Sequence, residues 1–124
     1  MTNQTSENRQ RTLEQERAKF AWACVSRMKT NPQKKEYGQL ARGAAADIQI
    51  NGLGQTLAFW RAKNNNELLS DVSSWLKQQL AFTQPEVIDW IANTASTDDY
   101  RRATAEAVAV LIWIKRFSEA ELIE

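Results

Sequence analysis

The 124-residue sequence contains no histidine, one cysteine, four glycines and two prolines. Without histidine the chain lacks the commonest general base at neutral pH, and serine–histidine and cysteine–histidine nucleophiles are excluded. The single cysteine excludes an internal disulfide and, with no histidine, the usual structural zinc sites. Four glycines and two prolines are few turn residues for a β-sandwich or a β-barrel. The composition therefore favours an all-α fold and gives no positive support to an enzyme.

Long apolar runs are also missing. No stretch reaches the roughly 18 apolar residues of a membrane span, so we expect no membrane contact. Residues 1–10 are polar and have no apolar periodicity, which predicts a disordered N-terminal arm. They do not have the pattern of a signal peptide, and we expect a cytoplasmic protein. The remaining length suits one helical domain over residues 11–124.

Apolar residues recur at spacings of three and four along most of the chain, which is typical of amphipathic helices. This pattern predicts a single compact bundle of about five to six helices. The predicted helices cover residues 12–28, 33–48, 53–63, 67–81, 87–92 and 98–122. Asn51-Gly52 has no flanking strands and predicts a bend between helices. Gly43 indicates either close helix packing or a kink.

Two helix starts have their own signals. The segment Thr83-Gln84-Pro85-Glu86 fits a capping box with proline in the first turn. Asp98-Asp99 comes at the start of the last helix, where the helix dipole favours negative charge. This helix is about 35 Å long. Its apolar run AVAVLIWI predicts burial at the centre of the bundle or against another protein.

Charge is unevenly distributed along the chain although the formal net charge is only +1. Residues 17–42 contain seven basic residues and one acid, Glu36. Residues 67–99 contain six acids and one base, Lys77. If the fold keeps these two segments apart, the molecule has one basic and one acidic surface.

The basic surface is interpreted as a phosphate-binding surface for RNA, with a solvated helix face as the alternative. The candidate RNA-binding residues are Lys19, Arg27, Lys34, Lys35, Arg42, Arg61, Lys63, Lys115 and Arg116. The acidic side and a neighbouring tryptophan are interpreted as a protein interface. Its candidate residues are Glu67, Asp71, Glu86, Asp89 and Trp90.

Five tryptophans are many for this length. Core filling explains most of them, but Trp22 and Trp60 lie close in sequence to basic residues and are candidates for contact with RNA bases. Cys24 falls on the apolar face of its helix and is expected in the core. The Asp98-Asp99 pair would serve a magnesium-dependent enzyme only if further carboxylates converged on it.

Two segments resemble a known family. Residues 51–60, NGLGQTLAFW, and residues 100–117, YRRATAEAVAVLIWIKRF, are similar to the best-marked stretches of the small helical subunit of the type III-B CRISPR effector, the Cmr complex. The resemblance spans roughly residues 13–122. It departs at Ala44-Ala45-Ala46-Asp47, where the family often has a Leu-Pro pair before the bend.

The resemblance implies a non-catalytic subunit with no cofactor that acts in antiviral defence. Copies of such a subunit stack head-to-tail into a minor filament beside the backbone subunits that hold the crRNA. One end of the filament meets the large polymerase-like subunit, and the assembly lines a groove for target RNA. Lys115 and Arg116 match positions of the family motif, whereas the other RNA candidates depend on charge alone.

Two alternatives remain open from the sequence. One is a helical protein–protein adaptor with no RNA contact, in which the basic segment binds an acidic partner. The other is a metal-dependent enzyme built on Asp98 and Asp99.

Overall fold

The computed structural model describes the backbone of residues 2–123 and the side chains of residues 12–123. Within these bounds the chain has six helices and no strand, which confirms the predicted all-α fold. The helices are α1 (Thr2–Met28), α2 (Lys34–Asn51), α3 (Leu53–Ala62), α4 (Asn66–Leu80), α5 (Val87–Asn93) and α6 (Thr97–Glu121). The predicted disordered arm, residues 1–10, lies outside the residues whose side chains are described and stays a prediction.

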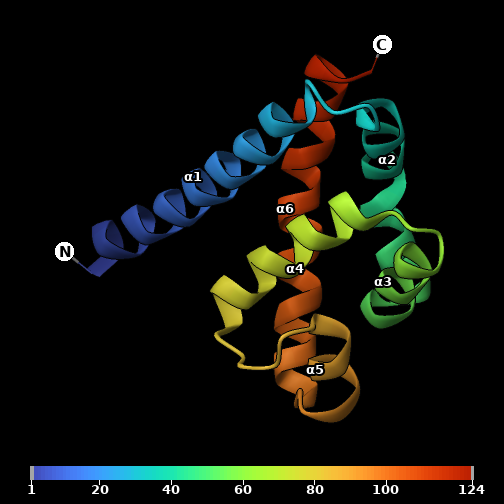
Figure 1. Cartoon of the computed structure of the whole chain (residues 1–124). Coiled ribbons are helices and arrows are strands. Elements are labelled where there is room, and N and C mark those ends of the chain that lie inside the picture. The colour runs from blue at the N-terminus through green and yellow to red at the C-terminus, as the bar shows by residue number, and fades with distance from the viewer. Residues whose placement is uncertain (1, 124) are drawn as a thin grey trace.

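Helix α6 is the axis of the molecule, with α1, α2 and α4 packed around it (Figure 1). Its core residues Ala103, Ala107, Val110, Leu111 and Ile114 are fully buried and follow the spacing of three and four that defines one helix face. The small alanines allow the neighbouring helices to approach closely. The prediction of a long, central last helix is confirmed.

The connections between helices follow local sequence signals. Gly52 has a φ of 89°, in the region that favours glycine, and forms the predicted bend between α2 and α3. Asn64, with a φ of 59°, lies in the turn that follows α3. At the start of α6 the Ser96 Oγ accepts a hydrogen bond from the Asp99 amide at 3.1 Å. The predicted acidic first turn of α6 is therefore confirmed.

The predicted capping box at residues 83–86 is wrong. Helix α5 begins at Val87, and its N-cap residue Glu86 makes no side-chain cap hydrogen bond. Phe82 is buried and stacks on Trp90, with ring centroids 4.5 Å apart. The Gln84 side chain donates to the Thr94 hydroxyl at 2.6 Å. These contacts hold the segment in a loop that crosses from α4 to α5.

Two glycines of α2 have opposite surroundings. A Cβ added at Gly43 would have no neighbour within 4 Å, so the close-packing interpretation of this residue is wrong. A Cβ added at Gly38 would lie 2.8 Å from the Ile123 side chain. Gly38 therefore allows the end of the chain to pack tightly on the start of α2. None of the described helices is long and apolar enough to cross a membrane.

Candidate nucleic-acid interface

A groove of about 660 Å³ lies between the start of α2 and the end of α6. Its charged lining residues are Lys34, Lys35, Arg42 and Glu121. Three of these are cations that the sequence analysis selected from charge alone, and the fold brings them together. The groove forms where the start of α2, at Lys34, lies beside the end of α6, at Glu121. Ile123, which also lines it, packs against Gly38.

The two lysines of the groove have no ion-pair partner among residues 12–123, and both are exposed. Arg42 lies 3.6 Å from Glu119, measured from Nε to Oε2. Lys29, outside the groove, lies 3.3 Å from Glu121, measured from Nζ to Oε2. Lys34 and Lys35 are thus the cations of the groove most available to a phosphate, because an existing partner need not be displaced.

The two family-matched cations lie on α6 near this groove. The Arg116 side chain is 70% exposed and approaches Glu119 at 3.5 Å, so Glu119 is shared by cations from α2 and α6. Lys115 is half-buried and makes no ion pair within the described chain. Lys19 is exposed on α1, ten residues before Lys29 and about 15 Å away along the helix axis.

Arg27 has a structural role, because it bonds to acidic residues of its own chain. Its Nη1 donates to Asp71 Oδ1 at 2.7 Å and its Nη2 donates to Asp71 Oδ2 at 2.8 Å, with a further bond to Glu67 at 3.0 Å. These bonds raise the pKa of the Arg27 guanidinium. Arg27 is occupied by partners of its own chain, so we remove it from the candidate RNA-binding residues.

The same contacts correct the expected charge layout. Arg27 belongs to the basic segment, whereas Glu67 and Asp71 belong to the acidic one, so the fold does not keep the two segments apart. Arg61 pairs with Glu86 at 2.8 Å in the same way. Basic and acidic side chains meet wherever α1 and α3 approach α4 and the loop before α5.

The predicted protein interface is reduced by these pairings. Asp71 and Trp90 are buried inside the fold and present no surface to a partner. Glu67 and Glu86 are held by arginines. Asp89 is exposed and accepts a hydrogen bond only from its neighbour Asn93, at 2.7 Å. Of the five residues, Asp89 is the acid most available at the surface.

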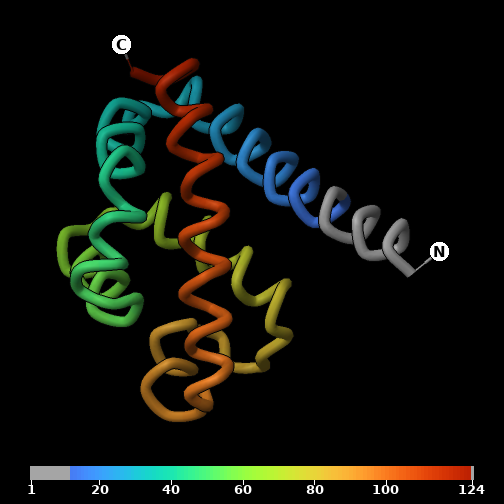
Figure 2. The backbone as a smooth tube through the Cα atoms, turned by 180° about the vertical axis from the view of Figure 1, so that it is seen from behind, coloured from blue at the N-terminus to red at the C-terminus, as the bar shows by residue number. Residues whose placement is uncertain are grey.

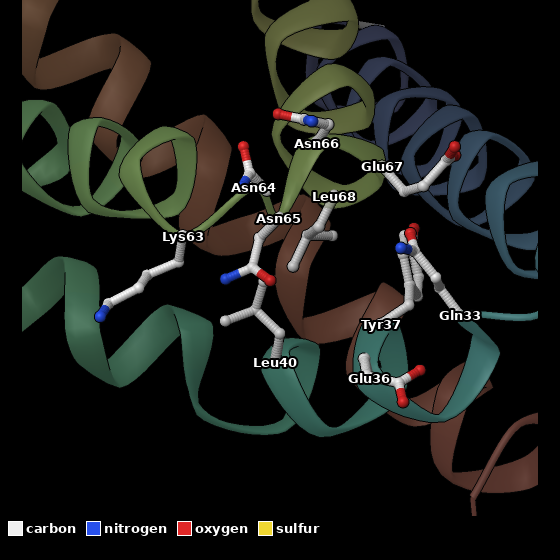
Figure 3. Close-up of a pocket in the computed structure, with 10 residues that line it drawn as sticks. All are labelled: Gln33, Glu36, Tyr37, Leu40, Lys63, Asn64, Asn65, Asn66, Glu67 and Leu68. Carbon is white, nitrogen blue, oxygen red and sulfur yellow. The ribbon is translucent and has the colours of Figure 1, made fainter.

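Lys63 lies apart from the α2–α6 groove. It lines a second hollow of about 250 Å³, between α2 and the turn that joins α3 to α4. Figure 3 shows Asn65 pointing across this hollow toward Leu40, while the Lys63 chain extends away from the other labelled residues. The Lys63 ammonium instead lies over the exposed Phe59 ring, 5.7 Å from its centroid. Lys63 and Arg61 do not line the groove that contains Lys34 and Lys35.

The tryptophans divide by burial. Trp60, Trp75 and Trp90 are buried, so core filling is the correct interpretation for them and the suggested base contact by Trp60 is wrong. Trp22 is 45% exposed. Cys24 is buried as predicted, and burial, with Asp71 nearby, raises the pKa of its thiol to about 12.

A partly buried polar cluster around Glu106 was not predicted from the sequence. Glu106 accepts two hydrogen bonds from Arg17, at 2.7 and 2.9 Å, and one from the Trp75 indole at 3.0 Å. This cluster joins α1, α4 and α6. The Arg17 bonds hold the pKa of Glu106 below its ordinary value, although burial opposes them. The only feature of the sequence that marks this cluster is Glu106 itself, which lies between alanines on a helix predicted to be buried.

The acidic residues form no metal centre in the part of the chain whose side chains are described. There, no three His, Cys, Asp or Glu residues lie close enough together to hold a metal ion. Asp99 instead lies 3.6 Å from Arg102. The pair Asp98-Asp99 acts as the acidic first turn of α6 in this structure.

Comparison with known proteins gives a consistent result. Residues 13–121 match the family model described as CRISPR-associated protein (Cas_Cmr5). The fold is also similar to the crystal structure of a CRISPR-associated Cmr5 family protein from Thermus thermophilus. The TM-score is 0.72 at 28% sequence identity, and the match covers 90% of this chain and 97% of that one.

Proposed function

Because the chain belongs to the Cas_Cmr5 family of CRISPR-associated proteins, and is thus a subunit of a multi-subunit Cmr effector complex, we propose that it is a non-catalytic filament subunit that contacts RNA. In this proposal, copies stack head-to-tail beside the crRNA-bound backbone subunits, and one end of the stack meets the large polymerase-like subunit. The cationic groove between α2 and α6 faces the RNA.

The RNA contact is supported by one observation above the others. Lys34 and Lys35 are exposed, unpaired within the described chain and placed on the rim of one groove with Arg42. Such a site neutralises phosphates and releases counterions without reading bases. This is the property needed by a subunit that must accept any guide and target sequence.

Head-to-tail stacking is supported by the arrangement along α6. Figure 1 has α5 and the start of α6 at one end of the molecule, and the end of α6 with the start of α2 at the other. The exposed acids Asp89 and Asp98 lie at the first end, which also carries Arg101 and Arg102, and Lys34 and Lys35 lie at the second, which also carries Glu36 and Glu121. In a heterologous contact, the acids of one copy would pair with the lysines of the next.

RNA binding as a function of salt tests the first part. We expect the wild-type affinity for a single-stranded oligoribonucleotide to fall as salt rises. The Lys34→Gln/Lys35→Gln variant should bind more weakly, with a salt slope smaller by about 1.4, because each lost phosphate contact removes about 0.7.

A matched control separates local from global charge. The Gln55→Glu/Gln78→Glu variant changes two exposed residues of α3 and α4 and lowers the net charge by the same amount, two units. We expect it to bind RNA nearly as the wild type does. Equal weakening by both variants would show that only net charge matters. An intact RNA affinity with loss of the effector complex in the lysine variant would favour the adaptor alternative.

A charge exchange tests the stacking. Asp89→Lys/Asp98→Lys and Lys34→Glu/Lys35→Glu should each reduce the number of copies per purified complex. A chain carrying all four changes should restore it, since the exchanged side chains are again complementary in charge. If the combined variant assembles no better than either double variant, these residues do not form the contact.

A further inference from the structure

Trp22 is the most exposed of the five tryptophans, and like the half-buried Trp113 it packs on Phe117. The Phe117 ring lies edge-on to the indole, with centroids 5.1 Å apart and an interplanar angle of 82°. The Lys29 ammonium lies 5.2 Å from the indole centroid. The ring is therefore braced by the end of α6 on the protein side, and a flexible cation lies over it.

Cations flank this indole along α1. Lys19 precedes Trp22 by three residues and lies on the same face of α1, and Lys29, the first residue after the helix, reaches back over the indole. Lys19 and Lys29 are both exposed. Lys19 makes no ion pair within residues 12–123. An exposed aromatic ring between two lysines combines a stacking surface with attraction for phosphate.

This stripe joins the cationic groove. Lys29 contacts Glu121 at 3.3 Å, and Glu121 lines the groove together with Lys34 and Lys35. In the view from behind, α6 lies between α1 and α2, and the ends of the three helices meet at one end of the molecule (Figure 2). A strand leaving the groove over the end of α6 would pass Lys29 and then reach Trp22.

Building on the RNA contact proposed above, we propose that Trp22 is a stacking platform for an unpaired base of single-stranded RNA, whose flanking phosphates are bound by Lys29 and Lys34. Every base has a π face, so stacking adds affinity without choosing a sequence. Because Phe117 already fixes the indole, little side-chain entropy is lost when a base stacks on it. Lys29 is exposed, and it would have to leave the indole and its ion pair with Glu121 to bind a phosphate.

The lysines favour RNA over a protein as the occupant. Tryptophan is enriched at protein interfaces, but lysine is depleted there. Trp22 has a lysine on both sides along its helix. Ile112 of α6 is also exposed, at 49%, but its aliphatic side chain offers no surface for stacking.

Three variants of the full chain test the platform with two probes. The probes are a single-stranded oligoribonucleotide and an abasic ribose-phosphate strand of equal length. Trp22→Ala should weaken binding of the oligoribonucleotide about 5- to 150-fold and leave the abasic strand unaffected. Trp22→Phe should retain most of the affinity. Ile112→Ala, the apolar control, should bind both probes as the wild type does.

The salt dependence of RNA binding distinguishes base stacking on Trp22 from phosphate binding in the groove. The salt slope should be unchanged in Trp22→Ala, because stacking releases no counterions, whereas Lys34→Gln/Lys35→Gln should reduce it. If the lysine variant loses RNA affinity and Trp22→Ala does not, the groove stands and the platform is refuted. If the wild type binds neither probe, both fail. If Trp22→Ala keeps RNA affinity but loses the other Cmr subunits, Trp22 belongs to a protein interface and the platform is again refuted.

Discussion

Arg27 and Asp71 form a two-bond pair between α1 and α4, with donor–acceptor distances of 2.7 and 2.8 Å. The buried Tyr37 hydroxyl of α2 donates a third bond to the same carboxylate, at 2.7 Å. Three helices are thereby held by one carboxylate that is almost inaccessible to solvent, while the arginine is about half exposed. Removing the cation should therefore be more harmful than its exposure suggests.

Arg27→Met should lower the free energy of unfolding by about 2 kcal/mol, because it leaves Asp71 charged and buried with only the tyrosine as partner. The double variant Arg27→Met/Asp71→Asn should be more stable than Arg27→Met, since the buried charge is then gone. Urea unfolding at pH 7 measures both. A double variant less stable than Arg27→Met would mean that the bonds, rather than the uncompensated charge, account for the loss.

The Glu106 cluster should make stability depend on acid pH. Arg17 lowers the pKa of Glu106 from its ordinary value of 4.5. Glu106 thus binds a proton less tightly in the folded state than in the unfolded state. Its contribution to the free energy of unfolding is complete above about pH 4.5 and is lost as the pH falls through the pKa of the folded state. Glu106→Gln should lower the free energy of unfolding by about 1.5 kcal/mol at pH 7. This difference from the wild type should become smaller as the pH falls.

Urea unfolding between pH 7 and pH 2.5 tests this dependence. Glu16→Gln is the control, because Glu16 is exposed on α1 and makes no ion pair within the described residues. Its stability should follow the wild type at each pH. A constant difference between Glu106→Gln and the wild type across the range would contradict a titrating role for the carboxylate.

The two glycines of α2 give a matched pair for thermal unfolding. Gly43→Ala should raise the free energy of unfolding by about 1 kcal/mol, because alanine is the better helix former and nothing lies near the new methyl group. At Gly38 the same gain should be cancelled or reversed by the overlap with Ile123. Equal melting temperatures for the two variants would mean that the end of the chain moves aside freely.

Local signals predicted most of the fold. The apolar spacing placed α6 at residues 98–122, within one residue of its observed bounds, and Asn51-Gly52 marked the α2–α3 bend. The capping box predicted at residues 83–86 was wrong because a tertiary contact decides how the chain enters α5. Phe82 must reach the core and stack on Trp90, and this holds the preceding loop out of the helix.

Long-range pairs explain what the sequence could not predict about the surface. Arg27 and Asp71 are 44 residues apart, and Arg17 and Glu106 are 89 apart. No spacing rule relates such residues, so a charge count along the chain cannot tell a free cation from a paired one. Lys34 and Lys35 were selected from charge alone, and only the structure distinguishes them from the paired arginines.

Helix α6 is made after the five helices that pack around it. During synthesis, the earlier helices therefore emerge with their apolar faces uncovered, and α1 must wait for a partner that lies about 90 residues further on. The contacts between α1 and α6 join the most distant parts of the sequence. The conformational entropy of the loop between them is therefore lost late in folding. Folding of this subunit is thus expected to be completed after translation of the α6 segment, and a nascent chain stalled before residue 97 should require a chaperone to stay in solution.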